Sequence, residues 1–273
     1  MKKRSLFERI AAAPYIAWSA AFIIGPLLFV VYFAFTDTNG NFTFNNILSL
    51  SSYSHTFVMS IGFSLIATTV CLLIGYPLAY AMSRMSERAR TILTVLLMLP
   101  MWISLLIRTY SLMALLDNGG LVNTFLTTIG LPPVQFIGTH TAVILGMIYD
   151  FLPYMVLPIY TSMTKLDKRY LEAAADLGCN ARQTLSKVIL PLTMPGIVSG
   201  VTMVFVPSIS TFYISQKLGG GVFDLLGDTI ERQFQVPETY YIGAAISLVM
   251  MILILISLAV MNKFSDNKED IIV

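Results

Sequence analysis

The chain is poor in charge and in cysteine. Only 12% of its 273 residues are Asp, Glu, Lys or Arg, against roughly a quarter in an average globular chain. A soluble domain with so few charges could not cover its surface, so the composition predicts a membrane protein. The 2 cysteines, Cys71 and Cys179, lack metal-type spacing and a place for an extracytoplasmic disulfide. No phosphate-cradling Gly-x-x-x-x-Gly-Lys-Ser/Thr loop is present, which predicts no nucleotide site in this chain.

Long apolar runs make up most of what is present, since 56% of the residues are hydrophobic. A helix of roughly 20 apolar residues crosses the hydrocarbon core of a bilayer. The runs lack the roughly 10-residue alternation of an outer-membrane barrel, so we expect helices. The predicted spans are Pro14–Thr36, Phe57–Ser83, Thr91–Leu116, Thr139–Met163, Leu192–Ser215 and Tyr240–Met261.

The basic residues gather on one side of these spans. Most of the 17 Lys and Arg residues fall in four segments, which are 1–13, 84–90, 164–191 and 262–273. The positive-inside rule places these segments in the cytoplasm, and with them both termini. Lys217 and Arg232 are left in outside loops, and Arg108 lies within a span. The first apolar run is of span length with no small-residue cleavage site, so we predict a retained span and no signal peptide.

The polar segment 164–191 is predicted to form two short helices around a tight turn. Gly178 suits the left-handed residue that ends a helix, and Asn180 with Gln183 matches a capping box that opens the next helix. From these residues alone the hairpin either docks on a partner or lies on the inner leaflet. Its first helix carries an apolar stripe of Leu166, Tyr170, Ala174 and Leu177.

Part of this segment resembles the EAA motif of binding-protein-dependent ABC transporter permeases. That motif runs Glu-Ala-Ala, three residues, Gly, nine residues and Ile-x-Leu-Pro, and here Val188 replaces the Ile. The resemblance implies a coupling helix that inserts into a groove on a separate ATPase subunit. The residues to which it gives this role are Glu172, Ala173, Ala174, Asp176, Leu177, Gly178, Leu190 and Pro191.

The resemblance covers nearly the whole chain and is most specific to the spermidine/putrescine permeases of this family. Residues 99–116, 166–178 and 190–221 carry it. It implies an all-α polytopic membrane protein with the type I importer (MetI-like) fold, six transmembrane helices and a cytoplasmic coupling-helix hairpin. The implied organisation is a tail, first helix and external loop at 1–55, a transmembrane type-1 domain at 56–262, and a cytoplasmic tail at 263–273.

The resemblance also implies partners. These are two ABC ATPase subunits that hold ATP and Mg, a second related permease, and an extracytoplasmic polyamine-binding protein. The complex would lie in the inner membrane of a bacterium. This chain would bind no cofactor or metal and would be a transport subunit with no catalytic residues.

Ionisable residues within spans are costly and usually face a cavity or a partner. Asp150 either holds a substrate ammonium, by charge and by cation–π contact from neighbouring rings, or it only pairs with Arg108 or with backbone near Pro153. The candidates for the substrate pathway are Asp150, Tyr149, Tyr154, Trp102, Arg108, Tyr110, Ser208 and Tyr213. Trp102 and Tyr110 are alternatively interfacial or core aromatics, and the Ser208 hydroxyl alternatively bonds to helix carbonyls near Pro207.

Two other functions remain open at this point. The chain could be an ABC permease for another small solute such as iron, sulfate or phosphonate. It could instead be an ion-gradient-driven secondary transporter in which Asp150 is the coupling carboxylate. The second class is typically built from inverted repeats with paired broken helices, and the sequence shows no clear repeat.

Overall fold

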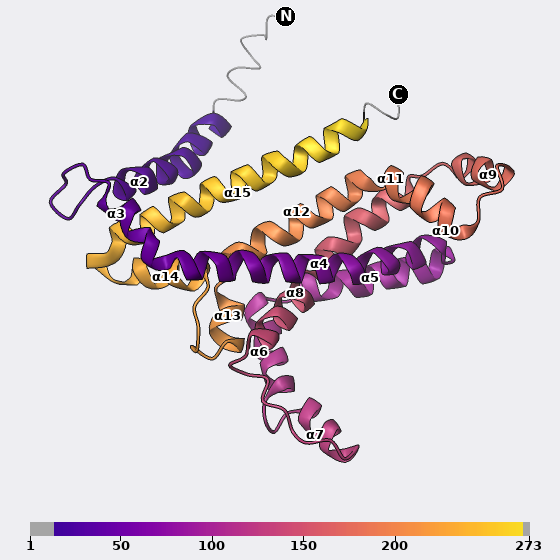
Figure 1. Cartoon of the computed structure of the whole chain (residues 1–273), viewed down its shortest axis with the longest axis horizontal. Helices are drawn as coiled ribbons and strands as arrows, with labels where there is room; N and C mark the ends of the chain where they lie inside the picture. Colours follow the sequence, from indigo (N-terminus) through magenta and orange to yellow (C-terminus); the bar gives the residue numbers. More distant parts are fainter. Residues whose placement is uncertain (1–13, 270–273) are drawn as a thin grey trace, which may run out of the picture. The chain divides into compact units, whose positions relative to one another are not determined.

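The computed structural model describes residues 14–269, with side chains as far as Lys263, and is built of helices joined by short connections (Figure 1). The predicted basic tail at 1–13 lies outside the described residues. Within the described part the only β pairing is an isolated bridge between Thr36 and Phe42. The chain divides into two compact units, residues 1–54 with 229–253, and residues 55–228 with 254–273.

The candidate spans reach the number of the six apolar runs if each of two bent helix pairs is counted as one span. Among residues 14–269, 4 helical segments are each long and apolar enough to cross a membrane, and two bent pairs raise the number to 6. The 4 segments are Pro14–Ala34, Asn45–Arg84, His140–Thr164 and Pro237–Lys263. They contain η1 (Ala20–Ile24), α2 (Gly25–Ala34), α3 (Asn45–Leu48), η2 (Ser49–Tyr53), α4 (Ser54–Arg84), α8 (His140–Thr164), η4 (Pro237–Thr239) and most of α15 (Tyr240–Glu269).

The third predicted span is not one helix. α5 (Glu87–Trp102) ends, Ile103 and Ser104 leave the helical conformation, and α6 (Leu105–Leu116) begins. The bend between Glu87–Trp102 and the segment formed by α6 and α7 (Leu121–Thr128) is 98°. Pro100 lacks the N–H that would donate to the carbonyl four residues earlier, which weakens the last turn of α5. The prediction of a continuous helix at Thr91–Leu116 was therefore wrong.

The fifth predicted span, Leu192–Ser215, begins close to the start of the observed helix but extends beyond its end. α12 (Met194–Ser210) begins after a 66° bend from the segment Ala181–Leu192. Pro195 lies in the first turn of α12. Backbone N–H groups in that turn have no intrahelical acceptor, so a proline there costs no helix hydrogen bond. Beyond an extended Thr211, α13 (Tyr213–Leu218) forms a separate short helix. α14 (Leu226–Gln235) then follows.

The helices α8 and α12 pack closely because two glycines of α12 lie on one face, four residues apart. A Cβ added at Gly200 would lie 2.9 Å from the sulfur of Met155 and 3.0 Å from its carbonyl oxygen. A Cβ added at Gly196 would lie 2.8 Å from the carbonyl oxygen of Pro158. Small residues at this spacing let helix backbones approach in a membrane. The two helices are therefore in close backbone contact.

The unit formed by residues 1–54 and 229–253 contains a small aromatic cluster. The ring centroid of Phe33 lies 5.2 Å from that of Tyr240 and 5.7 Å from that of Tyr241. In the loop after α2, the Asp37 carboxylate accepts hydrogen bonds from the backbone N–H groups of Asn41 and Asn39, each at 2.9 Å. These bonds lower the pKa of Asp37, and the bond from the Asn41 backbone has the largest effect. The carboxylate thus stays charged and keeps the loop closed.

Candidate functional site

The polar hairpin has the predicted form of two short helices around a glycine turn (Figure 1). In the turn after α9 (Lys168–Asp176), Gly178 has φ +74°. The N–H of Cys179 donates to the carbonyl of Ala174 at 3.0 Å, and the N–H of Gly178 donates to that of Ala175 at 2.9 Å. This pair of bonds is a Schellman motif, which requires a left-handed residue at the glycine position.

The second helix of the hairpin starts at the predicted capping box. The Gln183 N–H donates to the Asn180 side chain, and the Asn180 N–H donates to the Gln183 side chain, each at 2.9 Å. α10 (Ala181–Thr184) follows directly and continues through η3 (Leu185–Ile189) into α11 (Leu190–Leu192). Both ends of the turn are therefore fixed by local hydrogen bonds, so the hairpin has a defined shape.

An apolar face of α9 has no partner within the described residues. Leu177 is 83% exposed and Tyr170 is 50% exposed, and Ala173 lies between them on the same face. We call Tyr170, Ala173 and Leu177 the coupling face. Ala174, at the edge of the predicted stripe, is buried instead. α9 belongs to none of the candidate spans, so this face is open to a partner protein or to the membrane surface.

Acidic residues flank the coupling face. Glu172 and Asp176 are exposed and four residues apart, so they share a side of α9. Neither carboxylate forms an ion pair with another described residue. They are therefore available to basic groups of a docked partner.

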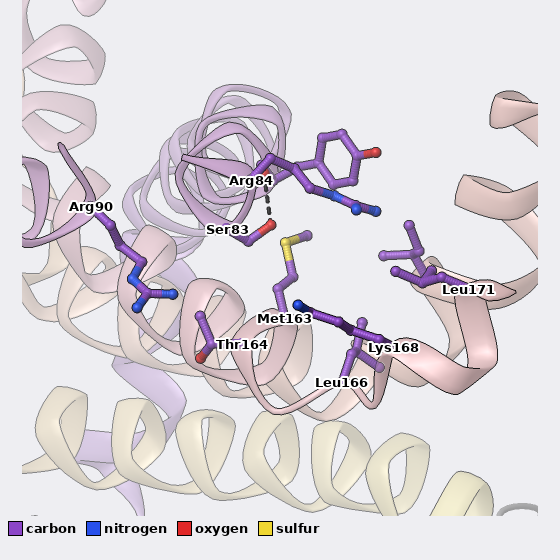
Figure 2. Close-up of a pocket in the computed structure, with 10 residues that line it drawn as sticks. Ser83, Arg84, Arg90, Met163, Thr164, Leu166, Lys168 and Leu171 are labelled. Atoms are coloured by element: carbon purple, nitrogen blue, oxygen red, sulfur yellow. Dashed lines mark hydrogen bonds between the residues drawn. The ribbon is translucent and has the colours of Figure 1, made fainter. Parts of the chain in front are cut away.

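A small basic pocket lies at the root of the hairpin (Figure 2). It has a volume of about 160 Å³ and is lined from α4, α5, α8 and α9. Figure 2 shows Lys168 beside Met163, and Arg84 reaching toward Leu171 across the pocket. The Arg84 guanidinium also lies 5.3 Å from the ring centroid of Tyr80. Together with Arg90, these cations gather where the hairpin leaves the apolar helices, which is the distribution that the positive-inside rule describes.

The hairpin joins α12 through a buried threonine that the sequence analysis did not single out. The Thr193 hydroxyl donates to the carbonyl of Ile189 at 2.8 Å and lies 3.2 Å from the hydroxyl of Tyr76 on α4. Leu190 is 39% exposed, and Pro191 is half-buried beside it. The signal that could have located this joint is Pro195, because proline favours the first turn of a helix and so marks a start nearby.

A buried ion pair connects α6 to α8. Nη1 of Arg108 lies 3.0 Å from Oδ1 of Asp150, and the two side chains are 7% and 1% exposed. The same nitrogen lies 3.4 Å from the Asp150 carbonyl oxygen. The second carboxylate oxygen, Oδ2, has no hydrogen-bond donor among the described residues. The pairing with Arg108, one of the two alternatives for Asp150, is thus observed, and one oxygen of the buried carboxylate is left over.

Two of the aromatic candidates are far more exposed than Asp150. Tyr149 and Trp102 are 43% and 71% exposed, whereas Asp150 is 1% exposed. Tyr154 lines a groove of about 570 Å³ between α8 and α12. Ser208 is buried, and its hydroxyl donates to the Val204 carbonyl at 2.6 Å. This is the second of the two alternatives for Ser208, a hydrogen bond to a helix carbonyl.

Two other candidates come together on α6 and α13. The ring centroids of Tyr110 and Tyr213 lie 6.0 Å apart, nearly perpendicular at 80°. Nζ of Lys217 lies 5.5 Å from the first centroid and 5.6 Å from the second. Lys217 was predicted to lie in an outside loop. Its spacing of four residues from Tyr213 could have indicated this contact, because such residues are neighbours on a helix.

These features define an all-helical membrane subunit of a transporter, with a structured polar hairpin between spans. The family described as "Binding-protein-dependent transport system inner membrane component" matches residues 71–268. The chain belongs to this family, which confirms the assignment made from the EAA motif.

Named relatives and a solved structure agree with this assignment. The chain is 36% identical to the spermidine/putrescine transport system permease protein PotB of Haemophilus influenzae, over 97% of each chain. It is 37% identical to the PotB protein of Escherichia coli, over 87% of this chain and 90% of that one. A bacterial ABC transporter involved in the import of the acidic polysaccharide alginate has a similar fold, with TM-score 0.77 and 21% identity, over 97% of this chain and 96% of that one. The predicted type I importer fold is thereby confirmed.

Proposed function

We propose that this chain is a membrane-spanning subunit of an ATP-driven polyamine importer and that it couples to its ATPase through the α9 hairpin. The names of the PotB relatives support the substrate. The observation that carries the coupling role is Leu177, a leucine that is 83% exposed within the EAA motif. Burial in a groove on a partner would remove this apolar surface from water and so favour docking.

The complete transporter in this proposal contains two ATPase subunits, a second permease like PotC and an extracytoplasmic binding protein like PotD. ATP and Mg are held by the ATPase subunits. The basic segments face the cytoplasm, which places both termini and the hairpin on the ATPase side. This chain supplies no covalent chemistry.

The hairpin transmits movement along a continuous packed route. A shift of the coupling face moves α10 and α11, and Thr193 joins α11 to α12 and lies close to Tyr76 of α4. α12 in turn packs against α8, which carries Asp150. Nucleotide binding and release by the ATPase then favour two different packings of the same helices, which open the pathway to opposite sides.

ATP-dependent uptake into liposomes tests the proposed function. We expect the complete transporter with its binding protein to accumulate labelled spermidine only when ATP is supplied, and to do so without an ion gradient. Uptake that continues under an ion gradient after ATP is removed would identify a secondary transporter. Competition by unlabelled iron, sulfate or phosphonate, without competition by putrescine, would instead identify a permease for another solute.

A further inference from the structure

Lys217 contacts two tyrosine rings in the way that an ammonium group of a polyamine substrate would. The Lys217 ammonium lies 5.5 and 5.6 Å from the ring centroids of Tyr110 and Tyr213. Cations within about 6 Å of an aromatic centroid are attracted to the ring face. A lysine side chain is a primary ammonium on a flexible chain of methylene groups. The end of a polyamine has the same structure, so the two rings cannot distinguish the two cations by chemistry.

The helix that carries Tyr213 is packed in place, whereas the Lys217 side chain is long and flexible. On α13, Ile214 and Leu218 are 0% exposed. A Cβ added at Gly146 of α8 would lie 2.8 Å from Cγ2 of Ile214, so the two backbones approach closely. Tyr110 is 48% exposed, which leaves its ring open to a ligand. The Lys217 ammonium sits on a flexible stem and can leave the rings without movement of α13.

We propose that Tyr110 and Tyr213 form a binding site for an alkylammonium group of the substrate, and that Lys217 is a tethered competitor for it. This inference rests on the proposed polyamine function. The arriving ammonium displaces the Lys217 ammonium, because two like charges cannot share one pair of ring faces. Lys217 thereby keeps the site filled when no substrate is present and raises the substrate concentration needed to occupy it.

Spermidine binding to the complete transporter in lipid nanodiscs, without the binding protein, tests this competition. We expect Lys217→Met to bind spermidine about 5- to 30-fold more tightly than the wild type, the range given by two cation–π contacts. Lys217→Arg keeps the charge and the ring contacts, so its affinity should stay near that of the wild type. An unchanged affinity in Lys217→Met contradicts the inference.

A double variant separates occupation of the rings from general charge repulsion. With Tyr213→Leu already present, Lys217→Met should produce a smaller further gain, because only the Tyr110 ring remains of the shared site. A gain of the same size in both backgrounds would show that Lys217 acts only through its charge and would overturn the proposal. If the wild type imports spermidine but Lys217→Met has no effect, only this inference fails. If the wild type neither binds nor imports polyamine, the proposed function fails and this inference fails with it.

Discussion

The variant Gly178→Val should lose substrate-stimulated ATP hydrolysis while its chain still inserts into the membrane. Gly178 has φ +74°, where a side chain carrying a branched Cβ is strongly disfavoured. A left-handed conformation costs an ordinary residue about 1–2 kcal/mol, which corresponds to roughly a 5- to 30-fold loss of the native turn. We expect a loss of at least this size in spermidine-stimulated ATPase activity of the reconstituted transporter.

The cause of this loss can be isolated, because a Cβ at Gly178 would meet no atom within 4 Å. Any defect therefore comes from the backbone conformation and not from a clash. Gly178→Asn should keep more activity than the valine variant, since asparagine adopts left-handed conformations more readily. Gly62→Ala on α4 is a matched control with equally open space and an ordinary helical backbone, and it should behave like the wild type. Normal stimulation in Gly178→Val would contradict a coupling role for this turn.

The variant Asp150→Asn should be severely impaired, because it leaves a buried arginine without its counter-ion. Arg108 and Asp150 are 6% and 1% exposed. Removal of one partner from a buried ion pair costs about 3–5 kcal/mol. We expect a lower unfolding temperature of the purified transporter and loss of spermidine uptake. The stability loss alone does not distinguish a structural carboxylate from one that also binds substrate.

Removing both charges separates these two roles of Asp150. The double variant Arg108→Met with Asp150→Leu replaces the ion pair with apolar side chains. The exchange of a buried ion pair for packed apolar groups is often neutral or stabilising. We expect the unfolding temperature to recover while spermidine uptake stays low, because no carboxylate oxygen remains for the substrate. Recovery of uptake together with stability would make Asp150 a purely structural residue.

The sequence predicted the hairpin in detail because its shape depends on local rules. Gly178 ends one helix and the Asn180–Gln183 box starts the next, and all three act on neighbours within a few residues. The pairing of Arg108 with Asp150 was foreseen as an alternative because a buried charge needs a counter-ion. These features needed no knowledge of how distant helices pack.

The broken spans and the tyrosine site depend on tertiary structure instead. Hydropathy is an average over a window, so it does not detect that Ile103 and Ser104 leave the helix. Tyr110 and Lys217 lie far apart in the sequence, and they meet only because α13 packs against α6. Tyr170 and Leu177 of the coupling face belong to the predicted stripe, and their exposure shows that the described residues leave them uncovered.

Cross-linking from Leu177 tests most directly whether ATP-driven motion enters this chain through its hairpin. A photoreactive amino acid at Leu177 should cross-link to the ATPase subunit in membranes that contain the complete transporter, and the yield should change when nucleotide is bound. Leu73 of α4, which is 69% exposed within an apolar span, is the matched control and should label only lipid. If the probe at Leu177 also labels only lipid, in every nucleotide state, the hairpin is not the coupling element.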